Sequence, residues 1–390
     1  MFLSNVSSLS RLRLASLAAV PLLLMACQTA PHSSSSVANP PATSSIALAS
    51  VLRQDAFDGI YEVTSTSNGD ALFVATVGDF DIQNSGTIHR LDPRSLQTLQ
   101  SSQVPRRSFA LGLNNTTGTL YAGNTMEGSL SVVDAASGLV KAVIQLAEPQ
   151  KNDKGETYFA HTRKVIVDEV NNRVFVTSPG RTGLIWIVDG ATNTLTHTIT
   201  SDGIWSSGAA YDAASNRLYV GQGGINEVLV IDPDAGTIVQ RISTGEVTEA
   251  NKDKSPNFFI NIALDAKGQR LFAAGGQNDQ VYVFDLKTGQ VVERIAFKAG
   301  ALDVLYNPTR NELVTTHRGK GETGTGFVSI LDATTYATKR TLDLPVHPNS
   351  LALSPNGQTL YITVKAPHGD KHPAWRKNGK DSVVRMDLNR

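Results

Sequence analysis

Cysteine is almost absent from this chain of 390 residues, in which Cys27 is the single example. One cysteine excludes an intramolecular disulfide framework, and it also excludes a CxxCH haem-attachment site. Net charge is absent too, because 35 basic residues balance 35 acidic ones. The overall charge therefore gives no argument for nucleic-acid binding, and any such argument needs a local patch. The sequence also contains no Walker loop, no Rossmann glycine fingerprint and no pair of zinc-ligand motifs.

The apolar run near the N-terminus extends only from Leu14 to Ala26, which is too short to span a bilayer. Two arginines precede it and Cys27 follows it, a pattern that resembles a bacterial lipoprotein signal. We expect residues 1–26 to be a signal peptide and Cys27 to be lipidated; the alternative is an ordinary secretory signal with an incidental cysteine. By the same resemblance, Gln28 implies an outer-membrane lipoprotein whose body faces the periplasm, and a soluble periplasmic protein is the alternative.

The stretch that follows Cys27 is rich in Ser, Ala, Pro and Thr, and residues 28–49 contain no Asp, Glu, Lys or Arg. Such a composition cannot bury enough apolar surface to become ordered. We therefore expect residues 27–49 to form a disordered tether. The length of the remainder suits one large domain, which we place at residues 50–390.

A short pattern recurs seven times in that remainder: a β-rich run ends in an apolar residue, followed by Asp and a turn. The seven residues are Asp92, Asp134, Asp189, Asp232, Asp285, Asp332 and Asp387. They are 42 to 55 residues apart, a period typical of propellers in which each repeat is one four-stranded blade. The sequence therefore predicts an all-β fold, a seven-bladed β-propeller of four-stranded antiparallel blades.

We interpret the repeated Asp as a turn residue between the third and fourth strands, because a carboxylate there can accept backbone N–H bonds. A ring of catalytic or metal-binding carboxylates is the alternative. The last blade stops at Arg390, one strand short. We expect an N-terminal strand, Ser45–Leu52, to complete this last blade and to close the ring, which removes exposed edges.

Strand order also separates the connections onto two faces. Turns between first and second strands are short, and so are those between third and fourth strands. Nearly all of the long segments are second-to-third or blade-to-blade connections, which lie on the opposite face: 76–86, 147–162, 244–258, 317–326 and 366–381. Long loops on one side of a rigid scaffold are where binding usually takes place.

The first group of candidate residues lies where the inner strands begin, near the central channel. It contains cationic and aromatic side chains together with amides: Arg106, Arg107, Phe109, His161, Arg163, Lys164, Trp205, Phe258, Phe259, Asn261, His347 and Asn349. Cations interleaved with aromatic rings suit an anionic ligand with stackable rings, such as single-stranded nucleic acid or a nucleotide. The alternative is that the aromatic rings pack between blades and the arginines bond to loop carbonyls.

Two further groups lie on the same face. The basic loop, residues 366–381, could clamp a phosphate backbone or could be a solvated loop; it contains His368, Lys371, His372, Trp375, Arg376, Lys377 and Lys380. Two histidines four residues apart are not enough to predict a metal. Asp303 and His317 belong to one blade and would permit general acid–base chemistry, with a structural hydrogen-bond network as the alternative.

Several runs resemble the YncE-like family of periplasmic, YVTN-repeat propellers. They are Leu113–Thr117, Ile185–Gly190, Phe258–Ile262 and His347–Ser354, and the resemblance extends over roughly residues 55–390. It implies a seven-bladed propeller that binds single-stranded DNA. The family's pattern is matched at Arg163, Phe258, Phe259, Asn261, His347 and Asn349. The lipoprotein-type cysteine and the basic loop depart from that pattern.

We therefore expect a membrane-tethered periplasmic propeller without catalytic machinery, which binds single-stranded DNA or another anionic ligand on the loop-rich face. One alternative is a lactonase-like hydrolase at the central channel, with Asp303 and His317 as its acid–base pair. The other is an interaction platform for an envelope protein. We expect no metal and no cofactor, contact with the membrane through the lipid anchor only, and a monomer.

Overall fold

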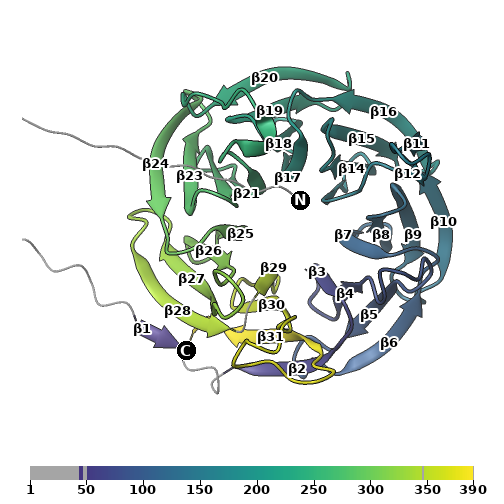
Figure 1. The fold of residues 1–390 in the computed structure, drawn as a ribbon, viewed down its shortest axis with the longest axis vertical. Helices are drawn as coiled ribbons and strands as arrows, with labels where there is room; N and C mark the ends of the chain where they lie inside the picture. The colour runs from purple at the N-terminus through teal and green to yellow at the C-terminus, as the bar shows by residue number, and fades with distance from the viewer. Residues whose placement is uncertain (1–43, 47–50, 345–346, 390) are drawn as a thin grey trace, which may run out of the picture. The chain divides into compact units, whose positions relative to one another are not determined.

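The second and third strands of the repeats are short runs of buried residues, such as Leu72–Thr76. A strand that is covered on both sides must carry apolar or small side chains on both of its faces. The fourth strands instead alternate exposed and partly buried residues, as Thr194–Thr200 does, which is the pattern of a strand with one face in solvent. In the computed structural model, which describes residues 44–46, 51–344 and 347–389, these runs form seven blades around a central channel (Figure 1). The predicted seven-bladed propeller is confirmed.

The blades follow chain order, and in each blade the first strand lines the channel while the fourth lies at the circumference. Blades one to three contain β3 (Ile60–Ser65), β4 (Leu72–Thr76), β5 (Thr87–Leu91) and β6 (Thr98–Gln103); β7 (Ser108–Asn114), β8 (Thr119–Asn124), β9 (Ser129–Asp134) and β10 (Val140–Gln145); β13 (Val165–Asp168), β14 (Arg173–Ser178), β15 (Leu184–Asp189) and β16 (Thr194–Thr200). Blades four and five contain β17 (Trp205–Asp212), β18 (Arg217–Gly223), β19 (Glu227–Asp232) and β20 (Thr237–Ser243); β21 (Phe259–Asp265), β22 (Arg270–Gly275), β23 (Gln280–Asp285) and β24 (Gln290–Ala296). Blades six and seven contain β25 (Ala301–Asn307), β26 (Glu312–His317), β27 (Gly326–Asp332) and β28 (Thr338–Leu344); β29 (His347–Leu353), β30 (Thr359–Lys365), β31 (Asp381–Asp387) and β2 (Leu52–Phe57). A hairpin of β11 (Gln150–Lys151) and β12 (Thr157–Tyr158) follows blade two, and a 3-10 turn, η2 (Lys252–Lys254), follows blade four.

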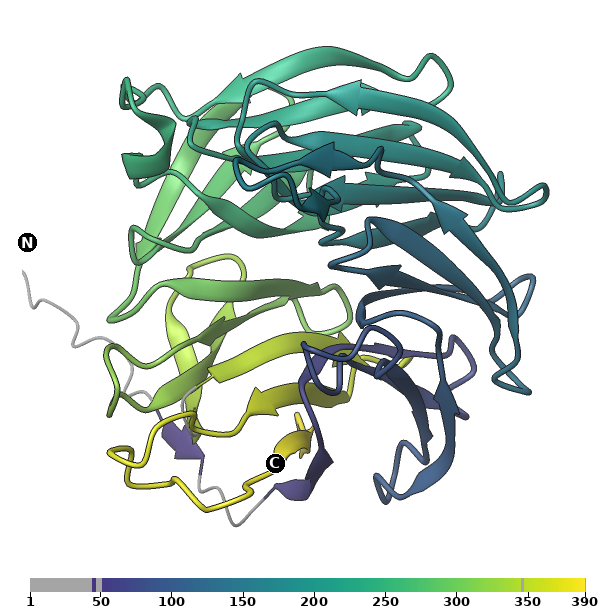
Figure 2. The ribbon, with the colours of Figure 1, turned by 45° about the vertical axis from the view of Figure 1, so that its right-hand side comes forward.

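The ring is closed by an N-terminal strand, as predicted, but that strand lies further along the chain than Ser45–Leu52. The closing strand β2 (Leu52–Phe57) pairs antiparallel with β31, and Figures 1 and 2 show the purple start of the propeller beside its yellow end. Residues 44–46 form β1 (Ser44–Ile46), which instead pairs parallel with β28 of blade six. The strand that ends at Phe57 closes the ring because the Phe57 side chain is buried in the apolar cluster between blades seven and one.

The core lies between the blades and not at the centre of the ring. Among the described residues, the buried apolar side chains form seven clusters, one at each interface between neighbouring blades. The largest fully buried side chain, Trp186, fills the interface between blades two and three. Burial of apolar area therefore holds each blade to its two neighbours, and the channel is left to polar side chains.

The repeated Asp is a turn residue in every copy. Each of the seven carboxylates accepts a hydrogen bond from the backbone N–H two residues further on, at 2.8–3.2 Å. Six of them also accept the next N–H. The N–H groups of Thr192 and Thr288 accordingly hold the pKa of Asp189 and of Asp285 below the usual value. This confirms the turn interpretation and explains why the pattern counts the blades.

We call the face that carries these turns the turn face, and the opposite face the loop face. The connections 77–86, 318–325 and 366–380 join second to third strands, and 146–164 and 244–258 join blades, so all five lie on the loop face. The predicted signal segment, Cys27 and tether residues 27–43 and 47–49 lie outside the described residues, whereas residues 44–46, which also belong to the predicted disordered tether, form strand β1. Among the residues that the structure describes, no helix is long and apolar enough to cross a membrane.

Candidate functional site

The channel opens on the loop face between the irregular starts of the innermost strands. In six of these strands the pairing with the second strand shifts register, as between Ile60 and Val63 in β3. Such a bulge leaves a residue outside the ladder and redirects its side chain. We call the residues that meet at this opening the channel mouth: Tyr61, Glu62, Phe109, Arg163, Lys164 and Lys365.

Two aromatic rings from neighbouring blades pack together at the channel mouth. The ring centroids of Tyr61 and Phe109 are 3.7 Å apart, with 32° between the ring planes. Phe80, from the loop that follows β4, meets Tyr61 edge to face at 6.4 Å and is 45% exposed. This tilted pair and the exposed Phe80 ring form an aromatic platform, and Phe80 is the ring on which a planar ligand could stack.

Two cations lie over the rings of the Tyr61–Phe109 pair. The Arg163 guanidinium lies 5.2 Å from the Phe109 centroid, and the Lys365 ammonium lies 3.5 Å from the Tyr61 centroid. Both distances are within the range of cation–π attraction. Burial raises the pKa of the Tyr61 hydroxyl, so Tyr61 stays a neutral ring at physiological pH.

Carboxylates already compensate these cations. The Glu62 carboxylate lies 2.9 Å from the Lys164 ammonium and 3.4 Å from the Arg163 guanidinium. Its second oxygen accepts the backbone N–H of Leu111 at 3.1 Å. Because Glu62 is buried and holds three donors, it is part of the scaffold and not a free acid.

Asp381 compensates Lys365 and also pins the closure of the ring. Its carboxylate lies 3.7 Å from the Lys365 ammonium, and it accepts the N–H groups of Ile60 and Ala366 at 2.8 and 2.7 Å. Burial lowers the pKa of Lys365 to about 8, against the opposing effect of Asp381. The last blade, the first blade and the basic loop are therefore joined at one carboxylate.

Polar side chains below the mouth link blade five to six, blade six to seven and blade seven to one. Asp303 accepts the N–H of Leu351 at 2.9 Å, Asn261 donates to the Leu302 carbonyl at 2.6 Å, and Asn349 donates to the Tyr61 carbonyl at 3.3 Å. Burial raises the pKa of Asp303 to about 6, although Lys164 and Arg163 act in the opposite direction. The structure therefore places Asp303, Asn261 and Asn349 in scaffold contacts around the channel.

His317 is fully buried and does not pair with Asp303. Its Nδ1 lies 2.9 Å from the Ala299 carbonyl and its Nε2 lies 2.7 Å from the Thr315 hydroxyl. Both nitrogens are thus occupied, and burial lowers the pKa of His317 to about 4. The two oxygens of Asp303 accept backbone N–H groups. The proposed acid–base pair is therefore two separate structural groups in this arrangement.

Of the aromatic residues predicted for the site near blades four and five, only Trp205 is exposed, while Phe258 and Phe259 are buried. Trp205 is 36% exposed and meets Phe258 edge to face at 5.9 Å. Phe259 has no exposed surface and packs against Tyr282 and Phe284. Trp205 could therefore contact a ligand directly, whereas Phe259 acts through packing.

The remaining cations of the first group lie at the rim of the mouth. Arg107 forms a 2.6 Å ion pair with Glu127 and also donates to the Phe80 carbonyl. The half-buried Arg106 side chain makes no hydrogen bond or ion pair with another described residue. Burial lowers the pKa of His161 and lowers that of His347 to about 4, so both imidazoles are neutral at physiological pH.

Two of the four Lys and Arg side chains in the basic loop form ion pairs with carboxylates outside that loop. Lys371 pairs with Glu322 at 2.7 Å and Lys380 with Asp58 at 2.6 Å. Arg376 donates to the Trp375 carbonyl at 2.7 Å, while Trp375 itself is half-buried and Lys377 is exposed. Within the described ranges, no three His, Cys, Asp or Glu side chains are close enough together to hold a metal ion.

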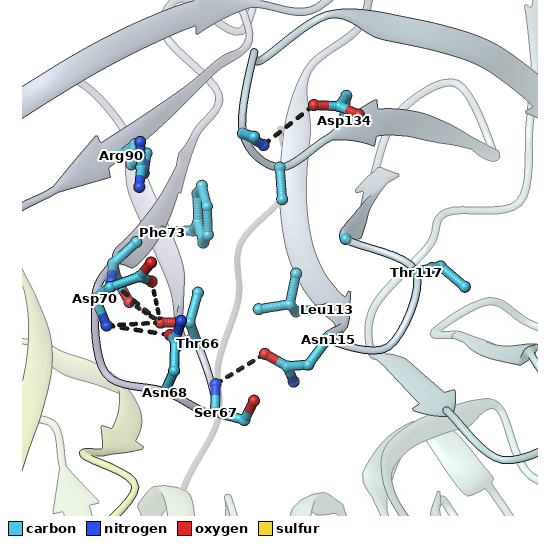
Figure 3. A pocket seen from close by; sticks show the side chains of 14 residues that line it. Thr66, Ser67, Asn68, Asp70, Phe73, Arg90, Leu113, Asn115, Thr117 and Asp134 are labelled. Carbon is cyan, nitrogen blue, oxygen red and sulfur yellow. Dashed lines mark hydrogen bonds between the residues drawn. The ribbon is translucent and has the colours of Figure 1, made fainter.

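The turn face also has a hollow, of about 280 Å³, between blades one and two (Figure 3). Its polar groups largely satisfy one another: Asn115 accepts the N–H of Ser67, Asp70 accepts the Thr66 hydroxyl, and Asp134 accepts turn N–H groups. We therefore place the candidate site at the channel mouth, where exposed rings remain available.

Four residues of this site were not predicted from the sequence: Tyr61, Glu62, Phe80 and Lys365. Tyr61 and Glu62 occupy the position in blade one that Asn349 and Ser350 occupy in blade seven, so alignment of the repeats could have found them. Lys365 ends β30 and meets Tyr61 only because the ring closes. Phe80 belongs to an irregular loop, and no local pattern signals its role.

The comparisons with known proteins point to one group. No protein-family model matches the chain. The uncharacterized protein YncE of Salmonella typhi is 34% identical to it over 345 residues, which cover 88% of this chain and 93% of that protein. YncE of Escherichia coli K12 is 33% identical over 338 residues, which cover 87% and 91%.

Proposed function

The chain belongs to the YncE family of seven-bladed propellers, and on that premise we propose that its channel mouth binds single-stranded nucleic acid through the bases. One observation carries the proposal: the exposed Phe80 ring lies beside the Tyr61–Phe109 pair, and Glu62 and Asp381 already neutralise the cations over that pair. Stacking on aromatic rings contributes about 1–3 kcal/mol per base in such sites. Paired cations gain less from a phosphate than free ones do, because an existing ion pair must be given up.

The proposal is tested by the fluorescence anisotropy of a labelled oligothymidylate, with an abasic strand of equal length and charge as the control. We expect saturable binding of the first strand and at least tenfold weaker binding of the second. The plot of log K against log salt has a slope of about −0.7 per neutralised phosphate for single strands, and we expect a total slope shallower than about −1.5 by that measure. Equal binding of the abasic strand, or no saturable binding, would overturn the proposal.

A platform for a protein partner is the second candidate, because apolar side chains project from the same loop. Phe80 is 45% exposed and Ile82 is 51% exposed, and exposed apolar groups near a rim are typical of interaction surfaces. An Ile82→Asp variant separates the two functions, since it removes apolar surface without touching the platform. Oligonucleotide affinity should stay within twofold, whereas recovery of a co-purifying partner should fall.

We extend the proposal to location: the propeller is attached to the bacterial envelope through a lipid on Cys27 and faces the periplasm. The support is the N-terminal pattern alone, in which an apolar run is followed by the single cysteine. Metabolic labelling with a palmitate analogue, followed by detergent partition, tests it against a Cys27→Ser control. Equal labelling of both proteins would contradict the anchor.

A further inference from the structure

A second hollow opens at the circumference of the ring, between blades five and six, and it has no part in the channel mouth. Its volume is about 510 Å³, within the range of small-molecule sites. It is bordered by the end of β24, the link after it, and the outer strands β27 and β28, which follow β24 around the ring (Figure 1). We call it the blade 5–6 groove, and its lining residues used below are Phe297, Lys298, Phe327, Ser329, Thr341 and Asp343.

The groove exists because blade six lacks a large side chain that other blades possess. The third residue before the turn Asp is Trp186 in blade three, Tyr282 in blade five and Ser329 in blade six, at the same register against the second strand. Trp186 and Tyr282 are fully buried and fill the interface with the preceding blade. Blade two also has a serine there, Ser131, but Asn124 hydrogen bonds to it. Only blade six, among these four, combines a small residue with an open hollow.

The floor of the groove is aromatic. Phe297 and Phe327 are both half-buried and both contact the buried His317, at ring-centroid distances of 4.2 and 4.4 Å. The His317 and Phe327 planes are nearly parallel, at 12°. A planar molecule in the groove would extend an existing stack of rings, which is a favourable arrangement for aromatic groups.

Polar groups without partners border this floor. The hydroxyl of Ser329, a residue that is 2% exposed, has no hydrogen-bond partner among residues 44–46, 51–344 and 347–389. The Thr341 hydroxyl, opposite Ser329 on β28, likewise has none in those ranges. Buried polar groups are normally hydrogen-bonded, so a hydroxyl left open in a hollow is a position for a ligand atom or for water.

We propose that the blade 5–6 groove binds a planar aromatic molecule of one or two rings that carries a hydrogen-bonding edge. The ring packs against Phe327 and Phe297, in the volume that Trp186 and Tyr282 occupy at their own interfaces. The polar edge of the molecule bonds to Ser329 and Thr341. The rim carries one cation, Lys298, and one anion, Asp343. Their opposite charges favour a neutral or zwitterionic ligand.

Indole is a suitable probe, because it has the size and the N–H edge that the groove calls for. Isothermal titration of the full chain with indole should give one saturable site. Ser329→Trp, which restores the side chain of blade three, should weaken indole binding at least tenfold, whereas Ser329→Ala should change it less than about fivefold. Thr341→Phe provides a second filled variant if Ser329→Trp is poorly folded. The melting temperature of each variant serves as the control for folding.

Two readouts separate this site from the channel mouth. Indole should shift the NMR signals of the His317 imidazole, which lies against the floor of the groove. Oligonucleotide affinity should be the same for Ser329→Trp and the unaltered protein, so failure of one site leaves the other testable. Undiminished indole binding in both filled variants would overturn the proposal, and so would shifts confined to the channel mouth.

Discussion

On the turn face, carboxylates and arginines recur from blade to blade and bond within the scaffold, whereas on the loop face the cluster of aromatic rings and cations at the channel mouth occurs at one place only. Arg173 and Arg270 are the clearest repeats: each reaches from its own blade into the next. On the loop face, the contact between Tyr61, Phe109 and Lys365 has no counterpart among the described residues of the other blades. The repeated residues therefore explain the fold, and the unrepeated ones are where function is to be sought.

The largest loss of stability from a single substitution is expected on the turn face. Arg173 binds Asp168 at 2.7 Å, and it also bonds to Asp234, Asn216 and Tyr211 of the next blade. Arg173→Ala leaves the buried Asp168 carboxylate unpaired, which should lower the free energy of unfolding by about 3–5 kcal/mol. Urea denaturation measures this loss, with Arg181→Ala as an exposed control. A loss below about 1 kcal/mol would show that these clamps are not what holds the scaffold.

The next effect concerns pH and lies in blade six. Burial raises the pKa of Asp303 from 3.8 to about 6, so its stabilising contribution is complete below about pH 4 and is lost as the pH rises through about 6. Burial lowers the pKa of His317 from 6.5 to about 4, so its contribution is complete above about pH 6.5 and is lost as the pH falls through about 4. The two groups therefore oppose each other, each by about 3 kcal/mol at most.

Single substitutions separate these opposing contributions. Asp303→Asn should lack the loss of stability that Asp303 causes as the pH rises from about 4 to 7. His317→Gln should lose less stability than the unaltered protein as the pH falls from about 6 to 4. Urea unfolding across that pH range is the measurement. Stability curves that run parallel for all three proteins would contradict the assigned pKa directions.

A smaller effect, on affinity and not on stability, is expected at the channel mouth. Phe80→Leu keeps an apolar side chain but removes the exposed ring of the platform. Loss of one stacking ring should weaken oligonucleotide binding by about 1–2 kcal/mol, which is roughly five- to thirtyfold. Phe259→Leu is the matched control, because that ring is fully buried elsewhere. Equal losses in both variants would move the site away from the platform.

The difference between the faces also explains what the sequence could predict. The repeated Asp and the Asn or Gly turns are local patterns, and positive φ angles at Gly69, Asn172 and Gly357 confirm such turns. Those patterns specify blade number, strand order and the face with long loops. The exact closing strand was missed because residues 44–57 contain two short strands, and only the burial of Phe57 decides between them.

Site residues were harder to predict because their contacts cross the ring. Glu62 and Lys164 come from blades one and three, and the Lys365–Tyr61 contact depends on closure of blade seven onto blade one. Composition identified cations near the channel, but it could not show that carboxylates neutralise them. Phe259 matched a family pattern, yet its role is to pack. The residues proposed for ligand contact at positions 106, 205 and 347 stay predictions.

The smallest effects on stability and on oligonucleotide affinity are expected in the basic loop. They test whether, within the loop face, the platform or the basic loop makes the main contact with the ligand. The ion pairs of Lys371 and Lys380 are exposed, and such pairs contribute about 0.2–1 kcal/mol to stability at most. If the bases bind at the platform, Lys371→Ala and Lys377→Ala should change oligonucleotide affinity less than about threefold. The slope of log K against log salt should change by less than about 0.7. Anisotropy titrations at two salt concentrations measure both quantities. If the slope of log K against log salt became shallower by about 0.7, the value of one phosphate contact, in either variant, the basic loop would bind the phosphate backbone. The platform would then be a secondary contact.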